Sequence, residues 1–479
     1  MSEAELEART LRRNVRELPA AAWWLVGGMF VNYFGAFVPM YLILFLPRDR
    51  GFTTAGASLA VGAYGLGELA AGPVGGSLAD RLGRRTTIVL TTLAAAACTM
   101  GLYAVHSRSA IIVAAFLTGF ATEAFRPAAS ALMTDLVPER QRVTALALMR
   151  FAGNLAFGIG GAVAGVLADR SYLWVFVMNA TSLLAFALLA AVALPRVPPP
   201  GAIADGGGSR DGDGYGHALR DRVLVVFLVA WALTAFVYAQ QQAALPLQVV
   251  ARGLPKRDFG LLLLANGLLV AVLELPISSW TMRRPARTMN ALAFLLVGVG
   301  FALTGLAART PAFLLTVVVW TAGEMVGAPV GSAFVAGLAP DRLRGRYLGL
   351  YQFAGGIGMV AGPTLGVLLW SHGHALLWEV SGAVGVVAAL LALAARGPRD
   401  AREQQAAGAK ERVRSATPAV EPVPFEPYLV AGGVPDPDPD PPPDPGAESS
   451  ARPGEPGGRA DRFVGLPAPR RRGGRHRRR

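Results

Sequence analysis

Residues 76–85 have the sequence GSLADRLGRR, with one acidic and three basic side chains in ten positions. They begin in the last turn of one apolar stretch, 54–79, and end just before another, 86–105. Each stretch supplies the roughly 20 mostly apolar residues that a membrane-spanning helix needs. Gly76 and Gly83 lack a Cβ atom and can form a tight turn. Because arginine is enriched in cytoplasmic loops of membrane proteins, we expect a short cytoplasmic loop between two spanning helices.

Further apolar stretches follow along the chain, and the composition agrees with them. The chain is 53% hydrophobic and 16% charged, with mean hydropathy +0.42, whereas soluble globular proteins carry about 25% charged residues. The stretches are continuously apolar rather than alternating, which favours helices over a membrane β-barrel. We therefore predict an all-α membrane protein of 12 transmembrane helices, at 21–46, 54–79, 86–105, 109–133, 143–168, 172–194, 222–250, 258–280, 287–308, 311–337, 345–370 and 374–395.

The charges outside these stretches predict the orientation and the division of the chain. With the N-terminus inside, nineteen Lys and Arg residues fall in the N-terminal segment and the cytoplasmic loops, against eight in the outer loops. This asymmetry predicts that both termini are cytoplasmic. We expect a cytoplasmic N-terminus (1–20), a six-helix bundle (21–194), a flexible linker rich in Pro, Gly and Asp (195–221), a second six-helix bundle (222–395) and a disordered tail (396–479).

Other classes of protein are disfavoured by what the sequence holds. The net charge of +13 could indicate nucleic-acid binding, but cytoplasmic loop arginines account for it better, so we expect no nucleic-acid partner. The lone cysteine, Cys98, cannot form a disulfide within the chain. The five histidines fall in loops or the tail, and no GxxxxGK[ST] loop is present. We expect no metal site, no cofactor and no enzyme activity.

The two halves of the sequence align without gaps when one is shifted by 202 residues. An even number of spans in each half makes this a parallel repeat, with two bundles related by an axis along the membrane normal. Such pseudo-symmetric bundles would enclose a cavity near the bilayer midplane. Matched residues include Pro127/Pro329, Pro138/Pro340, Arg140/Arg342, Phe151/Phe353 and Gly160/Gly362.

The stretch 76–85 resembles the G-x-L-A-D-R-x-G-R-R loop of the major facilitator superfamily. The corresponding stretch of the second half, 278–287, has Met282 in place of Asp80. The resemblance implies a secondary transporter that works by alternating access. We expect a charged latch that holds the outward-facing state and breaks on inward opening, and the alternative is a static surface loop. Its expected members are Gly76, Asp80, Arg81, Gly83, Arg84 and Arg85, with Asp135 and Arg142 at neighbouring helix ends.

Residues 158–165, GIGGAVAG, resemble the glycine-rich motif of the drug:proton antiporter branch of that superfamily. Gly161 stands where that motif has proline, and Ala164 where it has glycine. In the fourth segment, Ala115 stands where members of that branch have an arginine. Close helix packing is the alternative role for these glycines.

Charged residues inside spanning helices cost about 2.5–3.5 kcal/mol each and therefore usually face a cavity or a partner. Glu123 and Arg126 lie three positions apart on one helix face. We expect Glu123 to carry the coupled proton, with Arg126 as its partner or as a substrate contact, and a purely structural ion pair is the alternative. Glu324 and Glu68 are further candidates for proton coupling. Arg150 is a candidate partner for Glu68, and the alternative is that the Arg150 side chain extends to the membrane surface. We expect Glu274 to pair with the loop that holds Arg283 and Arg284.

In the superfamily, the first, fourth, seventh and tenth helices line the cavity. Asn32, Tyr33, Gln240 and Gln241 lie on the first and seventh. We expect them, with Arg150, to contact substrate, and interhelical hydrogen bonds are the alternative.

These features predict a bacterial plasma-membrane transporter that exports small amphipathic or cationic compounds, with protons as the coupling ion. One alternative is a symporter for uptake of a nutrient or metabolite, in which Arg126 and Arg150 would meet an anion. The other is a membrane sensor or scaffold that does not transport.

Overall fold

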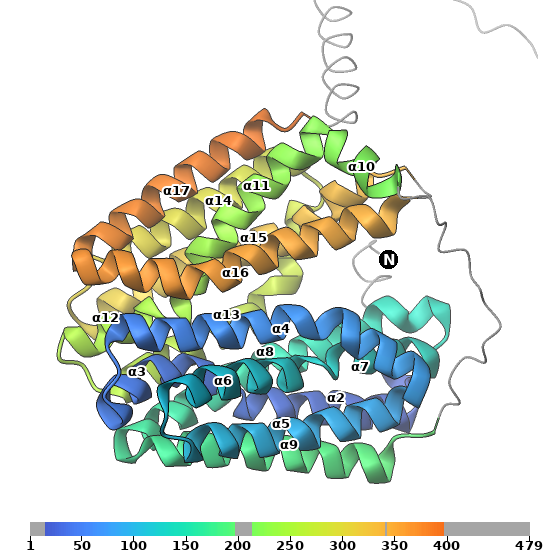
Figure 1. The fold of residues 1–479 in the computed structure, drawn as a ribbon. Coiled ribbons are helices and arrows are strands. Elements are labelled where there is room, and N and C mark those ends of the chain that lie inside the picture. The colour runs from blue at the N-terminus through green and yellow to red at the C-terminus, as the bar shows by residue number, and fades with distance from the viewer. Residues whose placement is uncertain (1–14, 197–212, 341–342, 397–479) are drawn as a thin grey trace, which may run out of the picture. The chain divides into compact units, whose positions relative to one another are not determined.

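The computed structural model describes residues 15–196, 213–340 and 343–396, and within these ranges the regular elements are helices (Figure 1). We call α2–α9 the N-terminal half and α10–α17 the C-terminal half. The N-terminal half comprises α2 (Ala20–Gly35), α3 (Val38–Arg50), α4 (Thr54–Leu82), α5 (Arg84–Ala104), α6 (Arg108–Glu123), α7 (Arg126–Leu136), α8 (Glu139–Arg170) and α9 (Tyr172–Ala193). The C-terminal half comprises α10 (Asp213–Arg220), α11 (Arg222–Tyr238), η1 (Ala239–Gln241), α12 (Ala244–Ala251), α13 (Lys256–Thr281), α14 (Ala286–Thr304), α15 (Thr310–Leu338), α16 (Arg344–His372) and α17 (His374–Ala394).

Within the described residues, 11 helical segments are long and apolar enough to cross a membrane. They match eleven of the twelve predicted stretches. The remaining helix, α4, has 29 residues but is not among them. Seven of its residues are glycine and it also holds Glu68, Asp80 and Arg81, which lowers its hydropathy. The membrane character of the fold is confirmed, and a twelfth span at α4 stays a prediction.

Three of the predicted continuous helices are interrupted. The first is broken at Ala36 and Phe37, the fourth at Ala124 and Phe125, and the seventh at the short helix η1. Irregular backbone at membrane depth is tolerated where it is buried in protein or lines a cavity. The breaks therefore mark the parts of these helices that face the protein interior.

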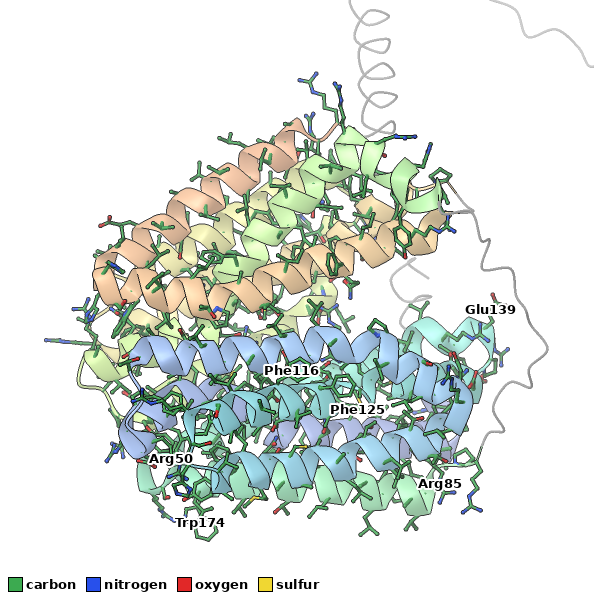
Figure 2. The ribbon with its side chains drawn as sticks, viewed as in Figure 1. Arg50, Arg85, Phe116, Phe125, Glu139 and Trp174 are labelled. Atoms are coloured by element: carbon green, nitrogen blue, oxygen red, sulfur yellow. The ribbon has the colours of Figure 1, made fainter. Side chains whose placement is uncertain are left out.

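Figure 2 shows Arg50 and Arg85 near opposite ends of the N-terminal half, and we name the two ends of the helices after them. At the Arg50 end, the two halves meet along α8 and α13. Asp169 Oδ1 accepts a hydrogen bond from Lys256 N at 2.9 Å, and Asp169 Oδ2 accepts one from Arg257 N at 3.2 Å. The carboxylate thus caps the first turn of a helix in the other half, where the N-cap residue Pro255 provides no side-chain cap.

Glycines make the α8–α13 contact possible. A Cβ atom on Gly260 would lie 2.5 Å from the carbonyl oxygen of Gly161, and one on Gly267 would lie 2.5 Å from Gly158 Cα. Gly158 and Gly161 belong to the glycine-rich stretch 158–165. Close helix packing, the alternative role given above for that stretch, is therefore what these two glycines do in this structure. A second contact joins α4 and α16, where Thr364 Oγ1 donates to Ser58 O at 3.3 Å.

The structure corrects two expectations about connecting segments. The expected loop at 76–85 is almost entirely helical: α4 continues to Leu82 and α5 begins at Arg84, so only Gly83, with φ 86°, forms the turn, and Gly76 is a helical residue. Part of the linker is ordered as α10, whose Ala218 is buried against α11 and α16. The rest of the linker (197–212), most of the N-terminal segment (1–14) and the tail from 397 lie outside the described residues.

Candidate functional site

Glu123 and Arg126 flank the break in the fourth span and form an ion pair across it. Arg126 Nε lies 3.1 Å from Glu123 Oε2, and Arg126 Nη2 donates a hydrogen bond to the Tyr33 hydroxyl at 2.8 Å. The Arg126 side chain is 52% exposed and that of Glu123 is 21% exposed. The expected pairing is therefore present, and the arginine is the more exposed of the two partners.

A cavity of about 410 Å³ adjoins this pair in the N-terminal half. Tyr33, Arg126, Arg150 and Asn154 contribute to its polar lining. Three of the residues predicted at the cavity are thus brought together here. The remaining lining residues are Met29, Ser130, Leu146, Met149, Gly153 and Phe157.

Glu68 lies close to the same pair. Helices α4 and α6 pack backbone to backbone, because Gly67 and Gly75 of α4 contact Phe116 and Ala124 of the fourth span directly. This contact places Glu68 where it interacts electrostatically with Glu123 and Arg126. The expected partnership of Glu68 with Arg150 is wrong.

Arg150 forms an ion pair with Glu274 of the other half instead. Arg150 Nη2 lies 2.6 Å from Glu274 Oε1, and Asn154 Nδ2 donates to Glu274 Oε2 at 3.4 Å. The prediction that Glu274 pairs with Arg283 and Arg284 is therefore wrong as well. Glu274 sits about two turns before the end of α13, on the face packed against α8, and the loop arginines lie beyond that end. Sequence separation alone could not identify a partner 124 residues away.

A second cavity, of about 280 Å³, lies within the C-terminal half. Its walls are mostly apolar and aromatic, with Trp231, Tyr238 and Phe294, and Glu324 is its one acidic residue. Asn266 Nδ2 donates to Glu324 Oε2 at 3.1 Å, and the Tyr238 side chain also interacts with this carboxylate. Arg150 is close enough to interact electrostatically with Glu324.

The polar residues expected on the cavity helices separate into two groups. Tyr33 lines the first cavity, as described above. Gln240 is fully buried in η1 and donates hydrogen bonds to Phe236 O at 2.8 Å and Gly362 O at 3.1 Å, so it joins the seventh span to α16. Asn32 and Gln241 are also buried, and neither lines the two cavities.

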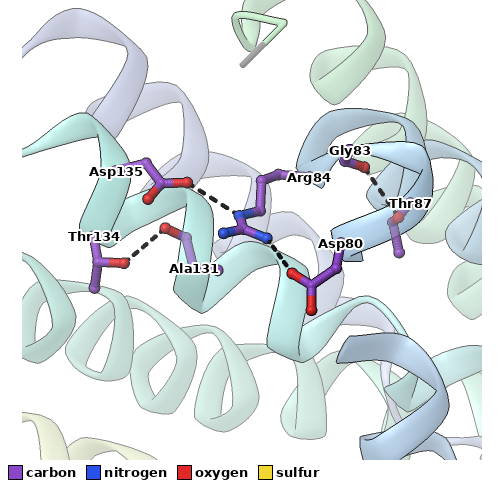
Figure 3. Close-up of polar contacts among 7 residues, drawn as sticks. All are labelled: Asp80, Gly83, Arg84, Thr87, Ala131, Thr134 and Asp135. Carbon is purple, nitrogen blue, oxygen red and sulfur yellow. Dashed lines mark hydrogen bonds and ion pairs between the residues drawn. The ribbon is translucent and has the colours of Figure 1, made fainter. Parts of the chain in front are cut away.

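The expected latch residues meet at the Arg85 end. Arg84 Nη1 lies 2.9 Å from Asp80 Oδ1, and Arg84 Nε lies 3.0 Å from Asp135 Oδ2 (Figure 3). Arg84 therefore joins α4, α5 and α7, all within the N-terminal half. Arg85 donates to the backbone oxygen of Ala191 instead. Among the described residues, Arg81 and Arg142 form no ion pair with this group.

Sequence reasoning misses two features of the site. It assigns Glu274 to a helix-end pair, although its position some two turns inside a span could have indicated an intramembrane partner. The aromatic cavity around Glu324 combines residues from four helices, α11, α14, α15 and α16, and no local motif in the sequence indicates it.

Comparisons with known proteins agree with this architecture. A 27% identical relative, the Na(+), Li(+), K(+)/H(+) antiporter of Planococcus maritimus, matches over 71% of this chain and 87% of its own length. The multidrug resistance protein MdtH of Cronobacter sakazakii is 26% identical, over 76% and 89%. The uncharacterized MFS-type transporter YttB of Bacillus subtilis is 27% identical, over 74% and 89%.

Solved structures share the fold at lower identity. A crystal structure of a peptide transporter POT in complex with sulfate superposes with a TM-score of 0.66 at 17% identity, covering 78% of this chain and 94% of that one. A crystal structure of a POT family transporter in complex with 5-aminolevulinic acid gives a TM-score of 0.67 at 15% identity, covering 78% and 96%.

The family model of the Major Facilitator Superfamily matches residues 25–255 and 242–435, which is most of the chain. The match includes both halves, the three broken spans and both cavities. Together with the helical fold and the curated relatives, it shows that this chain is a multi-pass membrane protein that belongs to the Major Facilitator Superfamily of transporters.

Proposed function

We propose that this transporter exports small amphipathic cations in exchange for protons, from the cytoplasm across the bacterial plasma membrane, with both of its termini cytoplasmic. The cavity in the C-terminal half supports this proposal best. It presents aromatic surface from Trp231, Tyr238 and Phe294 around one carboxylate, Glu324. Aromatic faces and a carboxylate both attract cations, and the apolar walls favour a hydrophobic body.

Two relatives are consistent with this direction of transport. Their names describe one as a multidrug resistance protein and the other as a cation/proton antiporter. An exchange of cation for proton also explains the carboxylates inside the membrane, because a carboxylate can hold either a proton or a cationic substrate.

The test is transport by purified protein in liposomes with an imposed pH gradient, using ethidium as a flat aromatic cation and fluorescein as an anion of similar size. We expect ethidium to move uphill in the direction opposite to protons, and fluorescein not to move. Glu324→Gln should weaken the apparent affinity for ethidium about tenfold, which corresponds to the roughly 1.4 kcal/mol of one partly solvated charge interaction. Reversing the pH gradient should reverse the flow. Flow of solute in the same direction as protons, or no response to the gradient, would contradict the export proposal.

Uptake of an anionic solute is the second candidate, and the cavity in the N-terminal half favours it. Arg126 and Arg150 both line this cavity, and their side chains are 52% and 50% exposed. Guanidinium groups bind carboxylates and phosphates through paired hydrogen bonds. Each arginine already has a carboxylate partner, however, whereas Glu324 has no direct ion pair among the described residues. The cation proposal therefore has the stronger support.

We also propose that the Asp80, Arg84 and Asp135 group regulates opening at the Arg85 end. Asp80→Asn removes the charge that Arg84 contacts at 2.9 Å but leaves Asp135 in place. Because a solvent-exposed pair contributes only up to about 1 kcal/mol, we expect transport to fall about three- to fivefold with membrane insertion unchanged. Asp80→Glu, which keeps the charge, is the control. Unchanged transport by Asp80→Asn would leave these residues as a static surface feature.

A further inference from the structure

At the Arg50 end, each half of the molecule caps a helix that belongs to the other half. Asp169, next to the last residue of α8, accepts hydrogen bonds from the backbone N–H groups of Lys256 at 2.9 Å and Arg257 at 3.2 Å, the first two residues of α13. In return, Lys256 Nζ donates to the carbonyl oxygen of Ala168 in the last turn of α8, at 2.6 Å. Such terminal N–H and carbonyl groups have no partner within their own helix. The two caps are therefore reciprocal.

The charges of both caps suit the helix ends that they contact. The N-terminus of a helix attracts an anion such as Asp169, and the C-terminus attracts a cation such as Lys256. The ammonium group of Lys256 also lies 4.5 Å from the ring centroid of Tyr172, which belongs to the N-terminal half. Both side chains bond to backbone groups, so their hold does not depend on an ion pair between them. Separation of α8 from α13 breaks all of these contacts together.

The same contact between the halves buries a hydroxyl group that opposes it. Tyr41 of α3 is fully buried, and its ring packs edge-on against Phe259 of α13 with centroids 5.6 Å apart. Among the described residues, no group forms a hydrogen bond with the Tyr41 hydroxyl. A buried polar group that has lost water without gaining a partner is destabilising. Opening between α3 and α13 would return this hydroxyl to water.

We propose that these residues form a counterbalanced gate at the Arg50 end. The reciprocal caps of Asp169 and Lys256 hold the two halves together, and the unpaired hydroxyl of Tyr41 lowers the stability of the closed state. The opposing contributions keep the closed and open states close in free energy, so that the gate can open and close readily. This inference concerns conformation alone and does not depend on the substrate or the direction of transport proposed above.

The test is the rate at which a buried cysteine in the contact reacts with a maleimide. Leu263 is 1% exposed and packs against Gly161 across the two halves, so Leu263→Cys in a Cys98→Ala background reports opening. The purified protein is labelled in detergent, where the reagent reaches both ends of the molecule. When opening and closing are fast relative to the reaction, the rate is proportional to the fraction of open molecules.

Substitutions of Asp169 distinguish a helix cap from an ion pair. Asp169→Ala removes the acceptor and should speed labelling about fivefold, the usual effect of losing an N-cap side chain. Asp169→Asn removes the charge but keeps one acceptor oxygen, and asparagine caps helices about as well as aspartate. We therefore expect its labelling rate to stay within about twofold of that of the Asp169 background.

Lys256→Met tests the same gate from the other half. It keeps the apolar stem but removes the donor to Ala168, and it should speed labelling about threefold, as expected for a hydrogen bond of modest strength. This variant also carries the test if Asp169→Ala does not yield folded, monodisperse protein. Asp258→Ala is the matched control in the first turn of α13, because Asp258 accepts a hydrogen bond from Thr310 within the C-terminal half, at 2.5 Å. It should leave the labelling rate unchanged.

Tyr41→Phe should act in the opposite direction. It removes the unpaired hydroxyl but keeps the ring against Phe259, so the closed state gains stability and labelling should slow about fivefold. Tyr347→Phe is its control, because the Tyr347 hydroxyl donates to Asp221 within the C-terminal half at 3.3 Å. This control should not slow labelling.

Three results would overturn the proposal. Labelling of Asp169→Asn as fast as that of Asp169→Ala would mean that charge, rather than capping, holds the halves together. Asp258→Ala as fast as Asp169→Ala would show that the effect does not come from contacts between the halves. Labelling of Tyr41→Phe at an unchanged or higher rate would remove the counterbalance. None of these results bears on ethidium export, which the liposome experiment tests separately.

Discussion

Replacing Arg126 by glutamine is expected to lower the rate of transport about a hundredfold. The change leaves Glu68 and Glu123 close together in the middle of the membrane with no cation beside them. Loss of one partner from a buried ion pair costs about 3–5 kcal/mol. Because the Arg126 side chain is 52% exposed, we expect the lower end of that range. Initial rates of ethidium transport in liposomes, corrected for the amount of inserted protein, measure the effect.

A second substitution separates charge from structure at this position. Glu123→Gln in the Arg126→Gln background removes one of the two unbalanced carboxylates and returns the site to its original net charge. Transport by this double variant should recover to within about tenfold of the unmodified protein, since the hydrogen bond from Arg126 to Tyr33 is still missing. If the double variant is as inactive as Arg126→Gln alone, Arg126 acts through its contacts with substrate or Tyr33 rather than by balancing charge.

Replacing Gly260 by alanine is expected to reduce transport about tenfold by preventing closure at the Arg50 end. The added methyl group would lie 2.5 Å from the carbonyl oxygen of Gly161, and the contacting atom is backbone that cannot rotate away. Inserting a methyl group into a packed contact costs about 1–3 kcal/mol, and about 1.4 kcal/mol corresponds to tenfold in an equilibrium constant. Separation of α8 and α13 relieves the clash, so the substitution favours conformations that are open at this end.

Cysteine labelling reports that conformational shift directly. Leu263 is 1% exposed and packs against the Gly161 region, and Cys98 is the chain's one native cysteine. With Cys98→Ala and Leu263→Cys as background, Gly260→Ala should speed labelling by a membrane-impermeant maleimide added outside. Gly72→Ala is the matched control, because a Cβ atom on Gly72 meets nothing within 4 Å. Equal labelling rates for the two variants would contradict this role of the α8–α13 contact.

Local composition is enough to predict most of the helices. Eleven of the twelve apolar stretches correspond to spanning segments, because each helix satisfies its own backbone hydrogen bonds and needs only sufficient length and hydropathy. Spacing along one chain also predicts the pairing of Glu123 with Arg126, since residues three positions apart are neighbours on a helix. The family resemblance of residues 76–85 predicts the meeting of Asp80, Arg84 and Asp135.

Tertiary structure alone decides which distant charges meet. Arg150 and Glu274 are 124 residues apart and come from different halves, and their contact depends on glycines that let α8 and α13 approach closely. A proline follows each break in the first, fourth and seventh spans, but proline also lies inside unbroken helices such as α4 and α15, so the sequence alone does not tell which spans break. A break in the membrane is stable only when neighbouring helices cover its exposed backbone groups. The charges of this protein can therefore be counted from its sequence, but their partners and cavities follow from how the helices pack.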